Sequence, residues 1–195
     1  MNVGVLALQG DVREHVEALC DLGLSAKVVK LPRDLEDLQG LIIPGGESTT
    51  IGKLMVIYDL LEPIRERILA GKMAAWGTCA GMILLSKDVG GHDQPLLGVM
   101  DTCIQRNAFG SQVDSFEAEV LIQAIGDAPF PAVFIRAPVV ESIGPNVKVL
   151  GRLPSNGWTV AIQQEMMLAT SFHPEIVKDR RLHRHFLTLC SLVDA

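Results

Sequence analysis

One pentapeptide has the form of a turn that presents a nucleophile: Gly77-Thr78-Cys79-Ala80-Gly81. It lies between apolar runs at 73–76 and 82–85, so the pattern predicts a strand, a tight turn and a helix, with Cys79 at the nucleophile position. Glycines on both sides suit such a turn, because its backbone is strained and neighbouring elements approach it closely. The start of the helix favours a thiolate and can hold a developing oxyanion. Taken alone, the pentapeptide is equally consistent with a small cysteine of the core.

A cysteine nucleophile needs a base and a group that orients the base. Of the five histidines, His173 is the best candidate because it lies in His173-Pro174-Glu175. Pro174 biases the residue before it toward extended backbone, in which side chains two apart point the same way. Glu175 could then hold one imidazole nitrogen while the other faces the thiol. The other histidines are interpreted as surface, packing or loop residues: His15, His92, His183 and His185.

A glycine-rich turn at residues 44–50, Pro-Gly-Gly-Glu-Ser-Thr-Thr, follows the apolar run 41–43. The turn therefore lies at the carboxyl end of a predicted strand, and α/β proteins bind ligands at the carboxyl edge of a parallel sheet. Adjacent glycines expose N–H groups that suit an oxyanion or a carboxylate. A phosphate-binding P-loop is excluded, because Leu54 takes the Ser/Thr position after Lys53 and Gly46 lies one residue too late.

Strands and helices must alternate to position these turns. Apolar runs predict four strands in the first half of the chain, at residues 3–8, 26–31, 41–43 and 73–76. Helices are expected over 12–22, capped by Asp11, and over 49–70, divided by Pro63. This alternation predicts an α/β fold in which helices cover both faces of a parallel sheet. The second half adds short strand candidates that predict an antiparallel extension, at 116–122, 132–135, 147–150 and 159–163, before a last helix from about Arg180.

Length and composition restrict the class of protein. The 195 residues suit one domain, 1–195, and 48% hydrophobic with only 5% aromatic residues suits strands buried on both faces. The four cysteines lack the spacing of a metal site or a disulfide framework. We therefore expect reduced thiols in the cytoplasm and no metal site. A net charge of −6 argues against nucleic acid. A basic cluster is therefore expected to be solvated or to contact a partner: Lys178, Arg180, Arg181 and Arg184.

No apolar run approaches the roughly 18 residues of a spanning helix, and residues 3–8 lack a basic leader, so neither a membrane span nor an export signal is expected.

The motifs together resemble the class I, triad-type glutamine amidotransferases, and within them the glutaminase subunits of pyridoxal 5′-phosphate synthases. The elbow and His-Pro-Glu are shared by the wider superfamily. Gly-Gly-Glu-Ser-Thr-Thr, Arg-Asn-Ala-Phe-Gly and Phe-Ile-Arg-Ala-Pro are specific to these subunits. The resemblance is carried by residues 4–10, 13–15, 44–50, 76–81, 106–110, 113–117, 134–138 and 169–175. Ser111 departs from the pattern where a basic residue is expected, which concerns a surface or partner contact.

The resemblance implies a flavodoxin-like three-layer sandwich and hydrolysis of L-glutamine to glutamate and ammonia. The ammonia would pass to a synthase subunit, in a large hetero-oligomer, that builds pyridoxal 5′-phosphate from a pentose phosphate and a triose phosphate. The implied triad is Cys79, His173 and Glu175, with an oxyanion hole of backbone N–H groups at Gly45, Gly46 and Ala80. The implied glutamine pocket is Gly46, Glu47, Ser48, Arg106, Ile135 and Arg136. Gln9 is similar to a family residue that links synthase docking to oxyanion-hole assembly. No metal or organic cofactor is expected.

Other readings stay open at this point. The chain could be the glutaminase subunit of another ammonia-channelling enzyme, such as imidazole glycerol phosphate synthase, because the triad would be the same. A non-catalytic regulatory subunit on this fold is disfavoured by the three filled triad positions. A stress-type cysteine hydrolase is disfavoured by the pocket segments. Without the resemblance, Arg106 and Arg136 are most simply solvated charges.

Overall fold

A seven-stranded sheet forms the centre of the computed structural model, which describes residues 1–106 and 115–193. Its strand order is β10-β11-β12-β4-β3-β1-β2. Five neighbouring strands pair in parallel: β1 (Val3–Leu6), β2 (Lys27–Val29), β3 (Gly40–Ile43), β4 (Ala74–Thr78) and β12 (Met167–Thr170). At one edge β10 (Lys148–Arg152) and β11 (Thr159–Gln164) pair antiparallel. The prediction of a mostly parallel sheet with an antiparallel extension is confirmed.

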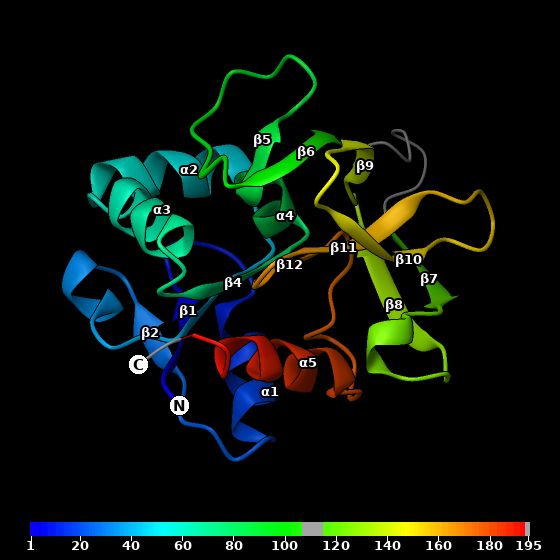
Figure 1. Cartoon of the computed structure of the whole chain (residues 1–195), viewed down its shortest axis with the longest axis horizontal. Coiled ribbons are helices and arrows are strands. Elements are labelled where there is room, and N and C mark those ends of the chain that lie inside the picture. The colour runs from blue at the N-terminus through cyan, green and yellow to red at the C-terminus, as the bar shows by residue number, and fades with distance from the viewer. Residues whose placement is uncertain (107–114, 194–195) are drawn as a thin grey trace.

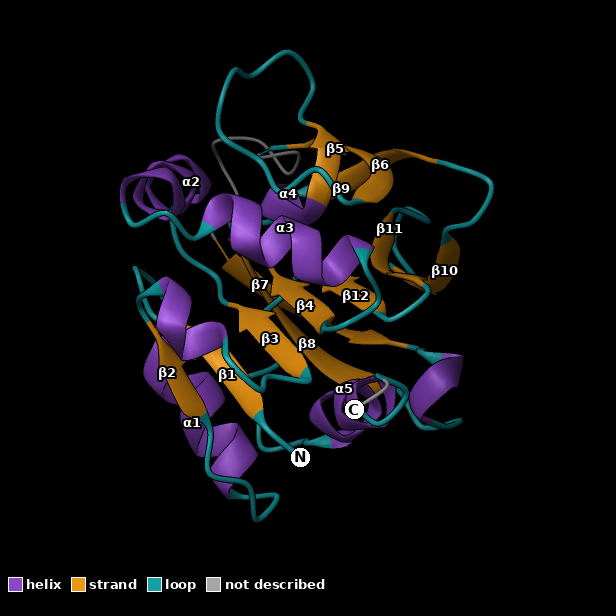
Figure 2. Cartoon of the chain, turned by 60° about the vertical axis from the view of Figure 1, so that its left-hand side comes forward, coloured by secondary structure: helices purple, strands orange, loops and turns teal. Residues whose placement is uncertain are grey.

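Helices cover both faces of this sheet (Figures 1 and 2). On one face lie α2 (Ser48–Ile57), α3 (Leu61–Leu69) and α4 (Ala80–Leu85). On the other lie α1 (Val12–Cys20) and α5 (Arg181–Cys190). Two short 3-10 helices, η1 (Pro32–Leu35) and η2 (Gln123–Ile125), complete the helical elements of the described residues. In that same part of the chain no helix combines the length and the apolar character needed to cross a membrane.

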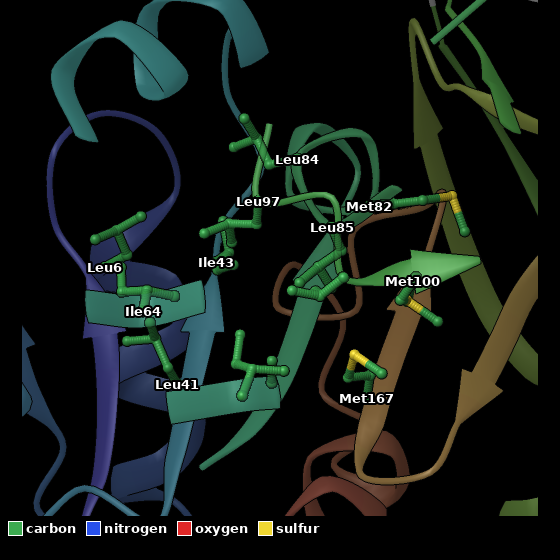
Figure 3. Close-up of a cluster of buried hydrophobic side chains, with 14 of the residues drawn as sticks. Leu6, Leu41, Ile43, Ile64, Met82, Leu84, Leu85, Leu97, Met100 and Met167 are labelled. Carbon is green, nitrogen blue, oxygen red and sulfur yellow. The ribbon is translucent and has the colours of Figure 1, made fainter. Parts of the chain in front are cut away.

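Two apolar clusters, one on each face, form the core. Every residue of β1, β3, β4 and β12 is buried, because helices or a hairpin cover both sides of these strands. On the α2–α4 side, Leu41 and Ile43 of β3 meet Ile64 of α3 and Leu84 of α4 (Figure 3). The apolar runs without alternation in the sequence follow from this double burial.

Two small sheets stand apart from the central one. β5 (Ser86–Asp88), β6 (Met100–Gln105) and β9 (Val139–Ile143) form a three-stranded sheet, and β7 (Ser115–Val120) pairs with β8 (Phe130–Ile135). The prediction that the strands near 116–122 and 132–135 extend the central sheet is therefore wrong. Phe134 stacks on Phe116 with ring centroids 4.6 Å apart and packs against Phe172 at 5.5 Å. The hairpin uses its apolar face to cover the central sheet, beside α5, and does not join its edge.

Two local expectations also differ from the structure. The helical region 49–70 breaks at residues 58–60, where Asp59 has φ +54°, and Pro63 lies in the first turn of α3, where a missing N–H is tolerated. Asp11 precedes α1, but its side chain makes no capping hydrogen bond. Its carboxylate Oδ2 lies 3.2 Å from Nδ1 of His173, so it has been drawn into the site.

Candidate active site

Four adjacent parallel strands, in the order β12-β4-β3-β1, deliver the candidate residues to one edge of the sheet. β1 leads into residues 9–11, β3 into the glycine turn 44–47, β4 into Cys79 and β12 into residues 173–175. Because the strands are parallel, their carboxyl ends meet at the same edge, and segments more than 160 residues apart in the chain converge there.

The turn at Cys79 is as strained as the pentapeptide predicts. Cys79 has φ +47° and ψ −103°, a conformation that favours glycine, and its side chain is largely buried. Its N–H donates to the carbonyl of Thr170 over 2.8 Å. A Cβ on Gly77 would lie 2.3 Å from backbone atoms of Gly81, and one on Gly81 would lie 2.0 Å from the carbonyl oxygen of Ile43. Both flanking glycines are therefore required by close backbone approach.

His173 and Glu175 form a buried hydrogen-bonded pair. Nδ1 of His173 lies 2.7 Å from Oε1 of Glu175, and the His173 N–H donates to the carbonyl of Val133. With Nδ1 directed at carboxylates, Nε2 is the nitrogen available to the thiol. Burial lowers the pKa of His173, but hydrogen bonds to Asp11, Cys79 and Glu175 outweigh it and raise the pKa to about 12. Burial raises the pKa of Glu175, and its contact with His173 opposes that shift. The geometry thus favours an imidazolium at His173, held between the Glu175 carboxylate and the Cys79 sulfur.

A cavity of about 430 Å³ opens at this edge. Of the site residues expected from the sequence, all but Gly45 and Glu175 form part of its wall, and Asp11, Ile83 and Pro138 are additional. The wall consists of Gln9, Asp11, Gly46, Glu47, Ser48, Cys79, Ala80, Ile83, Arg106, Ile135, Arg136, Pro138 and His173. The structure therefore brings the predicted nucleophile, base and pocket residues together.

The glycine turn is held by polar contacts on both sides. The Glu47 side chain caps α2 by accepting from the N–H groups of Thr49 and Thr50, and Arg106 Nη2 lies 3.1 Å from its Oε1. Burial raises the pKa of Glu47, but the hydrogen bonds from Thr50 and Thr49 outweigh it and lower the pKa to about 2. Oε1 of Gln9 accepts from the Glu47 N–H over 2.8 Å. Arg106 is therefore part of the cavity wall and Gln9 is tied to the turn.

Residues 5–192 match the SNO glutamine amidotransferase family. The chain belongs to this family. A protein of Desulforamulus reducens named pyridoxal 5′-phosphate synthase subunit PdxT is 53% identical, over 97% of this chain and 99% of that protein. The same name applies to a Thermus thermophilus protein, 53% identical over 97% of this chain and 98% of the relative. A crystal structure titled as a glutamine amidotransferase superposes with a TM-score of 0.93 at 50% identity, covering 98% of this chain and 100% of that one.

The fold of this SNO-family chain buries two histidines that the sequence analysis interpreted as surface or packing residues. His15 and His183 are fully buried. His15 Nε2 lies 3.1 Å from Thr78 Oγ1 and 3.4 Å from Glu175 Oε2, so His15 contacts the triad carboxylate. Asp11 was likewise missed as a contact of His173. One signal was present: Asp11 and His15 are four residues apart after the first strand, which places them on one face of a helix.

Two of the four residues of the basic cluster bind other groups of the chain. Arg180 binds Asp21 and the carbonyl of Val177, and Arg181 binds Asp179 and the carbonyls of residues 128 and 129. Ser111 and the neighbouring segment 107–114 lie outside the described residues. Among the described residues, one group has the composition and spacing of a metal site, Asp11 with His173 and Glu175, whose ligand atoms lie within 4.8 Å of one another. The two carboxylates already contact Nδ1 of His173. The absence of a metal stays a prediction.

Because His183 is buried, we expect the protein to lose stability as the pH falls. Burial, followed by the nearby charge of Arg180, lowers its pKa to about 3 from an ordinary 6.5. The unfolded chain then binds the extra proton between these values, so stability is fully present above pH 6.5 and falls as the pH drops toward 3. Between pH 7 and pH 4 we expect His183 to lower the free energy of unfolding by about 3 kcal/mol. His183→Gln keeps a donor for His15 but cannot titrate. Urea unfolding of both proteins at the two pH values checks this, and equal losses would contradict it.

Proposed function

We propose that this chain is the glutaminase subunit of a pyridoxal 5′-phosphate synthase. It hydrolyses L-glutamine to L-glutamate and ammonia, and the ammonia passes to a synthase subunit that makes the cofactor from a pentose phosphate and a triose phosphate. The observation that carries the proposal is Cys79 in a strained elbow beside the His173–Glu175 pair, at one cavity. The names of the relatives favour this synthase over imidazole glycerol phosphate synthase. A free thiol as nucleophile suits the reducing cytoplasm.

In this mechanism the thiol proton of Cys79 is first transferred to His173, and the sulfur then attacks the carboxamide carbon of glutamine. The tetrahedral intermediate collapses to a thioester as His173 returns the proton to the departing ammonia. Water, activated by the neutral imidazole, then attacks the thioester and releases glutamate and the Cys79 thiol. Glu175 holds Nδ1 of His173 throughout, which keeps Nε2 directed at the reacting atoms.

Backbone N–H groups would hold the oxyanion of each tetrahedral intermediate. Ala80 begins α4 immediately after the nucleophile, and Gly45 and Gly46 follow the end of β3. Ala80 and Gly46 both line the cavity. Gly46 has φ +154°, and a Cβ on it would lie 2.5 Å from Gln9 Oε1. Gln9 also binds the Glu47 N–H, so its side chain contacts this turn at two successive residues. Losing one such donor typically costs about 3–4 kcal/mol of transition-state stabilisation.

The substrate would lie with its amide at Cys79 and its amino-acid end among the polar wall residues. These wall residues are Gly46, Glu47, Ser48, Arg106, Ile135 and Arg136. Arg106 is engaged with Glu47, Thr49 and Gln94. Arg136, at φ +44° after β8, is exposed at the cavity and is the guanidinium we assign to the α-carboxylate of free glutamine.

Arg136→Ala is expected to raise KM for glutamine about 10- to 100-fold with kcat changed less than about threefold, because a carboxylate contact remote from the amide serves ground and transition states equally. Arg136→Lys should recover part of the loss. Steady-state glutaminase assays of the three proteins measure both constants. A fall in kcat at unchanged KM would place Arg136 in the chemistry and contradict this assignment.

Covalent labelling tests the proposal as a whole. The chain is treated with a glutamine-analogue diazoketone, with and without the synthase subunit, and the adduct is mapped by mass spectrometry. We expect one adduct, on Cys79, that excess glutamine prevents, and ammonia release that requires Cys79. Labelling of Cys20, Cys103 or Cys190 with Cys79 untouched would overturn the proposal.

A further inference from the structure

Beyond the triad, a row of buried polar side chains runs from Glu175 into the layer between the sheet and α5. Oε1 of Glu175 is taken by His173, and His15 Nε2 lies 3.4 Å from Oε2. On its other side, His15 Nδ1 lies 3.3 Å from His183 Nε2. All these side chains are nearly or fully buried, so water does not compete for their hydrogen bonds.

The contacts decide which nitrogens carry protons. Among the described residues, His183 Nδ1 and Glu175 Oε2 are buried without a hydrogen bond of good geometry. If His183 donated from Nδ1, a buried N–H would be unpaired and His15 would present a lone pair to the carboxylate. With the proton on His183 Nε2, His183 donates to His15 Nδ1, and His15 Nε2–H donates to Thr78 Oγ1 over 3.1 Å, with Glu175 Oε2 3.4 Å from the same nitrogen. This second arrangement leaves only an acceptor unpaired, which costs less.

We propose that His15 is a positioning residue for Glu175: its Nε2 lies 3.4 Å from Oε2, and the positive dipole of this N–H keeps the carboxylate ionised and directed at His173. The proposal rests on the proposed glutaminase function and extends it by one residue. Without the His15 N–H near Oε2, the buried carboxylate is more easily protonated, and a neutral Glu175 no longer stabilises the imidazolium of His173.

Other charged and titratable groups also face this carboxylate and contribute to its ionisation. Asp11, just before α1, also contacts Nδ1 of His173, and its negative charge disfavours the ionised form of Glu175. Arg180, just before α5, places Nη1 3.4 Å from the Glu175 carbonyl oxygen, and His183 lies behind His15. These groups stay in place in the variants below, so a difference between the variants reports on the His15 donor.

The amides of glutamine and asparagine separate the two nitrogens of His15. In His15→Gln the side-chain N–H₂ reaches the place of Nε2, whereas in His15→Asn it reaches only that of Nδ1. We expect His15→Asn to lower kcat about 10- to 100-fold with KM nearly unchanged, and to move the acid limb of the kcat/KM profile up by about one pH unit. His15→Gln should stay within about fivefold of the natural chain with its profile unmoved. The assays use the chain with its synthase subunit.

Phe186→Leu is the matched control, because Phe186 is fully buried against Trp76, as His15 is, but offers no polar atom. It should lower the melting temperature and leave the pH profile in place. Equal losses in His15→Gln and His15→Asn without a pH shift would mean a packing role and overturn the proposal, as would full activity in His15→Asn. The pH dependence of Cys79 alkylation by iodoacetamide supplies a readout without glutamine. If the natural chain hydrolyses no glutamine, the proposed function fails, while the alkylation profiles still decide the role of His15.

Discussion

Replacing Cys79 by alanine is expected to lower the rate of glutamine hydrolysis about a millionfold, to the background of the assay. The reason is chemical: no other group at the cavity can form the thioester, and loss of a triad nucleophile in a hydrolase has an effect of this size. Glutamate formation, measured with the synthase subunit present, is the direct readout. Residual activity above about one part in a thousand would mean that Cys79 is not the nucleophile.

A second substitution at the same position separates chemistry from folding. Cys79 has φ +47°, so alanine keeps the backbone strain whereas glycine relieves it. We expect the free energy of unfolding of Cys79→Gly to exceed that of Cys79→Ala by about 1 kcal/mol, although both variants are inactive. Thermal unfolding of the two variants compares them. Greater stability of the alanine variant would show that the elbow is not strained as described.

Glu175→Gln is expected to lower kcat about 10,000-fold, the effect seen when the carboxylate that orients a catalytic histidine becomes an amide. The amide nearly preserves shape but removes the charge that supports a protonated His173, whose pKa is held at about 12 by its partners. The pKa of His173 should therefore fall. Stopped-flow alkylation of Cys79 across the pH range, together with kcat, measures both effects.

Asp11→Asn is the matched control for that substitution, because Asp11 Oδ2 also approaches His173 Nδ1, at 3.2 Å against 2.7 Å for Glu175 Oε1. Asp11 is partly exposed and its charge is screened by solvent, so we expect a loss of only about tenfold. A larger loss for Asp11→Asn than for Glu175→Gln would reverse the assignment and make Asp11 the orienting carboxylate.

Local patterns predicted the parallel half of the fold well, because a strand buried on both faces is apolar throughout and its ends are marked by glycine and proline. They failed for the strands near Phe116 and Phe134. Alternation along β7 shows that one face is covered, but it does not say which sheet supplies the cover. That depended on Phe172, nearly 40 residues away from Phe134 in the chain and packed against it in the structure.

By itself, the sequence determined the parts of the site whose chemistry is local. The elbow needs glycines beside Cys79, and His173 and Glu175 share a short extended segment, so neighbours in the chain are neighbours in space. The tertiary structure decided what surrounds them. Asp11 and His15 reach the triad only because β1 and β12 end at the same edge of the sheet. Long-range contacts of this kind arise from strand order and burial, and a one-dimensional pattern carries no record of either.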